Sequence, residues 1–138
     1  MTPKLLFLRL FAYAFDFVVI NLLQYGLLFL LAKYLNFSTN LITIGGTFIT
    51  ISFFYFLILE KIHYTLGQFI FGLIVISKDH NKNIPFLRVL VRAILKSSVF
   101  LIAFSVIISP FLKGKQLLHD YLANTKVIGR KEYYQSNL

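Results

Sequence analysis

The stretch Arg9-Leu-Phe-Ala-Tyr-Ala-Phe-Asp16 places two opposite charges inside an otherwise apolar segment. Seven residues make about two turns of an α-helix, so Arg9 and Asp16 lie on one face, with Tyr13 between them. A charged group in hydrocarbon costs at least about 2.5–3.5 kcal/mol, so such groups usually face a protein interior and find partners there. We therefore expect the rest of the chain to supply those partners.

The composition indicates an integral membrane protein made of one domain. Of the 138 residues 58% are hydrophobic, and the mean hydropathy is +0.77. A water-soluble domain of this size could not bury that much apolar surface. The chain has 14 Lys and Arg against 5 Asp and Glu. Because these bases flank apolar segments, we expect anionic lipid as their counter-charge and no nucleic acid.

Two segments are long and apolar enough to cross a bilayer. The first, about residues 5–33, contains 23 residues (10–32) whose one charge is Asp16, and these would span roughly 34 Å as a helix. The second, about residues 41–60, contains 19 consecutive uncharged residues. The short polar loop between the two segments favours an antiparallel helical hairpin.

The second segment also has a face of small residues at helical spacing: Thr43, Gly46, Thr47 and Thr50. Small residues let helices approach and let hydroxyls bond across the interface, so this face is expected to pack against Arg9 and Asp16. In the alternative interpretation, the hydroxyls bond to carbonyls of their own helix.

The region after the hairpin is expected to lie at the membrane surface. Residues 64–83 combine a short apolar run, the β-branched Ile74-Val75-Ile76 and a polar turn at 78–83, which favours an interfacial, strand-like element. A helix follows at about 85–112. Its first part carries Arg88, Arg92 and Lys96 on one face, and this face is expected either to contact lipid headgroups or to be simply solvated.

The apolar residues 99–112 would form a helix of roughly 21 Å, which is short for a full span. If this part does not cross, 13 of the 14 Lys and Arg lie on one side of the membrane; if it crosses, the division is 8 to 6. The positive-inside rule favours the first arrangement, with a cytoplasmic N-terminus and a cytoplasmic tail at 113–138. A third full crossing is the alternative. In the tail, a short helix is expected at 116–123 with Asn124 as its left-handed cap.

The expected fold is thus an all-α integral membrane protein, multi-pass in a bacterial-type inner (cell) membrane. It has two full transmembrane helices, a third short membrane-embedded helix and interfacial amphipathic segments. A single domain covers 1–138, with helices at about 5–33, 41–60 and 85–112. Asp120, in the tail, is the expected second partner of Arg9.

Several groups of residues, in this order along the chain, resemble the motifs of one family. They are Arg9 with Asp16, Thr65-Leu-Gly67-Gln68, Gly72-Leu-Ile-Val, Arg92, and His119-Asp120-Tyr-Leu-Ala123-Asn124-Thr125-Lys-Val127. They resemble the RDD family of small membrane proteins, named for an Arg and an Asp in the first helix and an Asp near the end. Three features depart from the family pattern: Gln68 stands where Lys is usual, Asn124 replaces Gly, and the interval from Arg92 to His119 is short.

The resemblance implies no settled activity; transport has been suggested for the family, and cation/proton antiport for some members. The candidate site comprises charged residues with supporting neighbours: Arg9, Asp16 and Asp120, with Tyr13, Arg92, His119 and Thr125. One hypothesis is cation or proton handling at the buried acids by a homo-oligomer, since two or three helices cannot enclose a pathway. The other is a structural charge cluster in a non-catalytic assembly, regulatory or lipid-binding subunit, with lipid or another membrane protein as partner.

No enzyme, cofactor or metal site is expected. The chain lacks a recognisable Ser/His/Asp set, and its glycines are not followed by the Lys-Ser/Thr of a phosphate loop. His63, His80 and His119 have no metal-ligand spacing.

Overall fold

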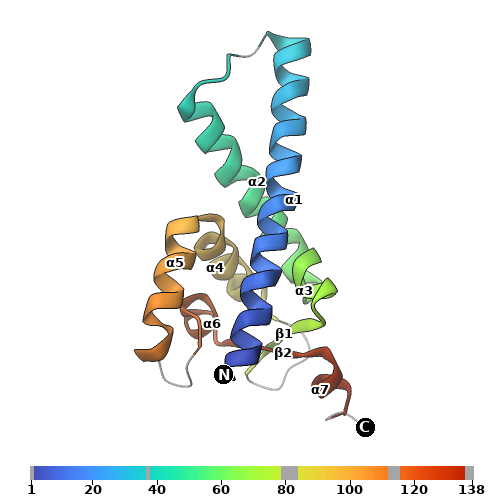
Figure 1. Ribbon diagram of the computed structural model, residues 1–138, viewed down its shortest axis with the longest axis vertical. Coiled ribbons are helices and arrows are strands. Elements are labelled where there is room, and N and C mark those ends of the chain that lie inside the picture. Colours follow the sequence, from blue (N-terminus) through green and yellow to red (C-terminus); the bar gives the residue numbers. More distant parts are fainter. Residues whose placement is uncertain (1, 37, 79–83, 112–115, 136–138) are drawn as a thin grey trace.

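The computed structural model describes residues 2–36, 38–78, 84–111 and 116–135, and these form a helical hairpin joined to a smaller body (Figure 1). The elements in chain order are α1 (Pro3–Leu35), α2 (Leu41–Lys61), α3 (Leu66–Ile70), β1 (Leu73–Ser77), α4 (Phe86–Ser97), α5 (Val99–Ile108), the 3₁₀ turn η1 (Ser109–Phe111), α6 (Leu118–Leu122), β2 (Thr125–Gly129) and α7 (Arg130–Gln135).

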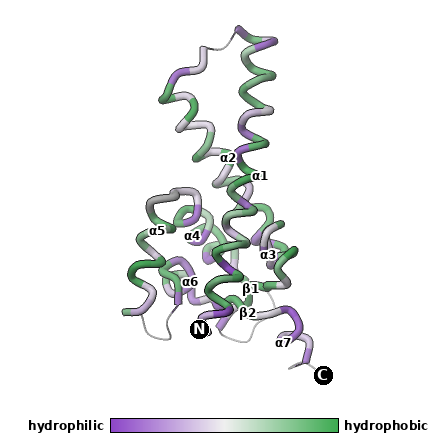
Figure 2. The backbone as a smooth tube through the Cα atoms, viewed as in Figure 1, coloured by the Kyte–Doolittle hydropathy of each residue, from purple (hydrophilic) through white to green (hydrophobic). Residues whose placement is uncertain are grey.

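Helices α1 and α2 are both long and apolar enough to span a membrane, as the sequence predicted. Thr2 caps α1 by accepting a hydrogen bond from the Leu5 amide at 3.3 Å, and Asn36 ends the helix in the left-handed conformation. Asn40 and Thr43 form a capping box that starts α2. Figure 2 shows that hydrophobic residues dominate the outer part of this hairpin, where large apolar side chains are exposed.

The remaining elements gather around the N-terminal half of α1, at the end of the molecule where both termini lie (Figure 1). Strand β1 confirms the strand-like element expected after the hairpin; most of the polar turn expected at 78–83 lies outside the described residues. The tail supplies β2, which pairs antiparallel to β1 from Leu73↔Gly129 to Ser77↔Thr125. The sequence did not predict this second strand. Its pairing with β1 attaches the tail to the centre of the body.

The third apolar segment is bent. Ser98 has extended dihedrals (φ −104°, ψ 119°), and Phe86–Ser97 meets Leu101–Phe111 at 102°. Helix α5 has 10 residues, roughly 15 Å, which is too short to cross a bilayer alone. Its Phe104 and Ile107 are exposed, as suits a short helix in contact with lipid. By length and composition, the segment counts as a third span only if α4 and α5 are taken together.

The small-residue face of α2 does not pack against Arg9 and Asp16, so that prediction is wrong. Thr47 and Thr50 donate to carbonyls of their own helix, Thr43 O and Gly46 O, both at 2.8 Å. From α1 this face receives Gln24, whose amide donates to Ile44 O at 2.7 Å. The spacing of the face was right, but its position along α2 places it beyond the buried charges.

Two apolar clusters fix the helices around the charged centre. Ala12 of α1 packs with Leu73, Val75 and Val127 of the two strands. Further along α1, a second cluster joins Ile20 to Tyr55 and Phe56 of α2 and to Ala93 of α4. The stretch of α1 between these clusters carries Tyr13 and Asp16, so apolar packing on both sides holds it against α2, α3 and α4.

Candidate functional site

Six charged side chains are buried together inside the body: Arg9, Asp16, Glu60, Arg92, Lys96 and Asp120. Each is at most 4% exposed. They come from α1, α2, α4 and α6, which are far apart in the sequence. Charges buried to this degree persist only when they are paired and hydrogen-bonded.

Asp120 joins the tail to two helices. It forms ion pairs with Arg9 of α1 and Arg92 of α4. Arg92 also donates to the Thr125 hydroxyl at 2.6 Å, at the first residue of β2. The expected docking of Asp120 on Arg9 is thus what the structure shows, with Arg92 as a second partner.

Glu60 extends the network to α2. Arg92 donates from Nε to Glu60 Oε2 at 2.8 Å, and Lys96 donates to Glu60 Oε1. The Lys96 ammonium also lies over the rings of Tyr13 (5.0 Å) and Phe56 (5.3 Å). The charges alternate along Arg9–Asp120–Arg92–Glu60–Lys96, and we call this set the ion-pair chain.

Asp16 is held differently from the prediction. We expected a guanidinium partner, but in the described residues neutral donors bind its carboxylate. Tyr55 OH donates at 2.6 Å, Thr65 Oγ1 at 2.6 Å and the Gly67 amide at 2.8 Å. Arg9 and Asp16 are about 10 Å apart along the axis of α1, and Arg9 instead forms its ion pair with Asp120.

The backbone at Gly67 comes into close contact with α1. A Cβ at Gly67 would lie 2.1 Å from the carbonyl oxygen of Ala12, so no larger residue fits without movement. Helix α3 is set in place by a capping box in which Gln68 accepts from the Thr65 amide at 3.0 Å. Gln68, which replaces the family's usual Lys, therefore has a structural role at the helix start.

His119 is buried beside the ion-pair chain. Its Nε2 lies 2.9 Å from Tyr13 OH and 3.5 Å from an Arg9 nitrogen, and since a guanidinium only donates, Nε2 is assigned as an acceptor. Burial, then the nearby cations Lys96, Arg92 and Arg9, lower the pKa of His119 well below its usual value, against an opposing effect of Asp120. His119 is thus a neutral imidazole whose Nε2 accepts a hydrogen bond from the Tyr13 hydroxyl.

Asp120 remains ionised despite its burial. Burial by itself would raise the pKa of Asp120, but Arg9 and Arg92, with a smaller contribution from Lys96, hold it well below its usual value. The tail is therefore attached to α1 and α4 by a permanent charge.

The prediction that Arg92 and Lys96 contact lipid headgroups is wrong. Arg92 is fully buried and Lys96 is 2% exposed, whereas Leu87 and Ile94 on the opposite face of α4 are 69% and 50% exposed. Helix α4 turns its charged face inward because Glu60 and Asp120 offer partners there. Arg88 is half-buried and donates to Ser77 Oγ at 2.7 Å.

The structure brings together the predicted Arg9, Tyr13, Arg92, His119, Asp120 and Thr125, with Asp16 adjacent. Sequence reasoning missed two residues of the site, Glu60 and Tyr55. One signal could have found Glu60. The chain has only 5 acidic residues against 14 basic ones, and the Arg92 and Lys96 side chains, one turn apart, need an acidic partner if they are buried. Within the described ranges, no three His, Cys, Asp or Glu residues group as a metal site; His80 lies outside those ranges.

Comparison with known sequences identifies the family. A sequence profile of the RDD family matches residues 4–124, which include all six buried charges. The chain belongs to the RDD family. The residues that suggested the resemblance are thus those that converge in space. This RDD protein is a small membrane protein, and Arg9, Asp16 and Asp120 lie in or beside one buried cluster.

A relative named "Uncharacterized membrane protein YteJ", from Bacillus subtilis strain 168, is 32% identical to this RDD protein over 80 residues. The alignment covers 57% of this chain and 49% of the relative, so the match spans about half the length of the relative. No solved structure matches.

Proposed function

We propose that this RDD protein is a non-catalytic membrane protein that binds anionic lipid at the membrane surface, as a scaffold or regulatory subunit. The observation that supports it most is a groove of about 420 Å³ between the start of α1 and the end of the sheet. The groove is lined by Lys4, Arg130 and Lys131, against one carboxylate, Glu132. Anionic lipid headgroups are attracted to such basic sites at the bilayer surface.

Arg130 is prepared for such a ligand. Its guanidinium lies over the rings of Phe69 (4.4 Å) and Tyr64 (5.3 Å), which hold it in place. Its Nη2 atom is buried, and nothing in the described residues accepts a hydrogen bond from it. A buried donor left without an acceptor costs about 1–3 kcal/mol, so a phosphate oxygen at this atom would be favourable.

The buried cluster supports a fixed scaffold. Two cations hold each of Asp120 and Glu60, and three neutral donors hold Asp16. Donors that point at every one of these carboxylates suit a rigid support better than acid–base catalysis. The proposal therefore assigns the cluster to holding the tail and the basic groove against the hairpin.

The proposed orientation follows from charge. If α1 and α2 cross a bacterial cell membrane and the bent pair of α4 and α5 does not, 13 of the 14 Lys and Arg fall on the side of the two termini, and Lys33 falls on the other. The positive-inside rule makes that side cytoplasmic, where anionic headgroups would meet the groove.

Native mass spectrometry of the protein in nanodiscs tests this proposal. We expect phosphatidylglycerol to be retained in preference to phosphatidylcholine, and Arg130→Gln with Lys131→Gln to remove that preference. Lys33→Gln is the matched control, because Lys33 is an exposed cation at the opposite end of α1. Equal retention of both lipids by the wild-type protein would contradict the proposal.

A second candidate function is proton or cation transport by a homo-oligomer, which one observation favours. Unlike Asp120 and Glu60, Asp16 is bound in the described residues by neutral donors only, so its negative charge has no directly bound cation. Such an acid could release or take up a proton. Flux measurements in liposomes test this: Asp16→Asn should abolish cation-dependent proton movement, and a wild-type protein that moves no ion under any gradient would exclude it.

A further inference from the structure

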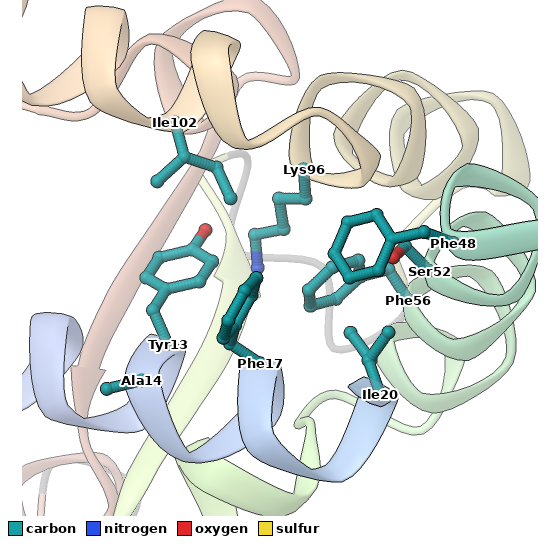
Figure 3. A pocket seen from close by; sticks show the side chains of 9 residues that line it. All are labelled: Tyr13, Ala14, Phe17, Ile20, Phe48, Ser52, Phe56, Lys96 and Ile102. Atoms are coloured by element: carbon teal, nitrogen blue, oxygen red, sulfur yellow. The ribbon is translucent and has the colours of Figure 1, made fainter. Parts of the chain in front are cut away.

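A cavity of about 190 Å³ lies between α1, α2, α4 and α5 (Figure 3). Its wall is almost entirely apolar, and four of its lining side chains are aromatic: Tyr13, Phe17, Phe48 and Phe56. Ala14 and Phe17 at its edge are exposed on the surface of α1, so the cavity opens sideways toward the lipid-facing surface of the hairpin.

Two hydrogen-bond donors reach this apolar space. Figure 3 shows the Lys96 side chain extending toward the rings of Tyr13 and Phe17. In the described residues one of its three N–H donors bonds to Glu60, and the ammonium lies 5.0 Å from the Tyr13 ring and 5.3 Å from the Phe56 ring. Ser52, 1% exposed, has a hydroxyl with no partner in the described residues. A ligand with acceptor oxygens would satisfy both donors.

The charge balance argues that this ligand is uncharged. The six buried charged side chains divide equally into three cations and three carboxylates. An anionic head would add a fourth negative charge close to Glu60 in a poorly solvated place, which is costly. A carbonyl oxygen accepts the same hydrogen bonds without that cost.

The size and the wall of the cavity favour a flat ring. An engineered cavity of about 150 Å³ in another protein holds benzene, so a volume of this order holds one substituted ring. Aromatic side chains prefer stacked or edge-on contacts with such a ring.

We propose that this cavity binds the carbonyl-bearing ring of a lipid-soluble quinone, with Ser52 and Lys96 as donors to its oxygens. The site lies apart from the basic groove and does not depend on the proposed headgroup binding, because the two cavities share no lining residue. A tail on the ring would leave past Ala14 and Phe17 into the bilayer.

The test is calorimetric titration of the protein in nanodiscs, with empty nanodiscs subtracted. The probes are tetramethyl-1,4-benzoquinone, the same ring without carbonyls (1,2,4,5-tetramethylbenzene), and dodecanoic acid. We expect saturable binding of the quinone, at least ~10-fold tighter than the hydrocarbon, and no competition by the acid. Ser52→Ala should weaken quinone binding roughly 3- to 10-fold, the value of one neutral hydrogen bond.

Ser52→Ala should still fold, since no described group loses a partner, and circular dichroism would verify this. Thr50→Ala is the matched control: its hydroxyl bonds to its own helix and lines a different cavity, so quinone affinity should not change. Ser52→Leu should fill the cavity and abolish binding. Unchanged affinity in Ser52→Ala, preference for the acid or the hydrocarbon, or no saturable binding would each overturn the proposal.

Discussion

Gly67 shows most clearly how one residue holds the membrane helix against the body. Its amide donates to Asp16, while its missing side chain lets the backbone reach Ala12 of α1. The pattern Thr65-Leu-Gly67 was visible in the sequence as part of a family motif. Its physical reason was not visible, because the neighbour that excludes a Cβ lies more than 50 residues earlier in the chain.

Gly67→Ala should destabilise the protein strongly, by about 3 kcal/mol or more, because the new methyl group overlaps a backbone carbonyl that cannot move without shifting α1. Thermal unfolding in detergent, followed by circular dichroism, measures the effect. Gly45→Ala is the control. A Cβ added at Gly45 would have no neighbour within 4 Å, so this substitution should leave the stability unchanged or raise it slightly. Equal unfolding temperatures for the two variants would contradict the close contact.

His119 makes stability depend on pH. Its folded-state pKa lies below the unfolded value of about 6.5, so on acidification the unfolded chain binds a proton that the folded protein does not. Stability should therefore fall as the pH drops from 7.5 to 5, by up to about 1.4 kcal/mol per unit. Asp120 adds little slope there, because its depressed pKa keeps its contribution intact above about pH 4.

Unfolding midpoints measured between pH 5 and 7.5 test this. His119→Gln should lower stability at pH 7.5 but flatten the dependence below pH 6.5, because glutamine does not titrate. If His119→Gln keeps the wild-type slope, another group is responsible and His119 is not held neutral.

At the scale of elements, α4 shows what a sequence pattern can and cannot predict. The spacing of Arg88, Arg92 and Lys96 correctly predicted a helix with one charged face. It did not reveal the direction of that face, because the usual rule sends charges toward water or headgroups. Beside a membrane hairpin the apolar face can meet lipid instead, and two acids from distant segments draw the cations inward.

A double-mutant cycle on Glu60 and Lys96 tests the inward face of α4. Glu60→Gln leaves the buried Lys96 without its carboxylate and should cost about 3–5 kcal/mol, whereas Lys96→Met should cost less, because Arg92 still pairs with Glu60. The double variant should cost clearly less than the sum of the two, because the remaining charges Arg92 and Asp120 still pair. Unfolding free energies give the coupling, and strictly additive losses would contradict a direct ion pair.

At the scale of the whole molecule, hydropathy sufficed to predict the hairpin, since α1 and α2 are long apolar runs. The body could be predicted only in part. The strand at Leu73–Ser77 has β-branched residues that signal it, whereas Thr125–Gly129 becomes a strand because β1 offers an edge. Pairing between segments some 50 residues apart is a tertiary contact that local patterns do not contain.

The proposed orientation, with both termini on the cytoplasmic side, predicts a labelling pattern. The chain has no cysteine, so single cysteines at Ser38, in the hairpin loop, and at Lys131, in α7, report on opposite ends of the molecule. In intact bacterial cells an impermeant maleimide should label the Ser38→Cys variant and not the Lys131→Cys variant. Labelling at Lys131→Cys without prior lysis would reverse or refute the proposed orientation.

The ion pairs that Asp120 makes with Arg9 and Arg92 hold the tail, and with it the small sheet, on the membrane hairpin. Hydrogen exchange of the β2 amides in Asp120→Asn tests this most directly, with the exposed Glu132→Gln as the matched acid-to-amide control. Asp120→Asn should speed exchange across Thr125–Gly129 by about 100-fold or more, and Glu132→Gln should not. Wild-type protection of β2 in Asp120→Asn would show that the buried aspartate does not hold the fold together.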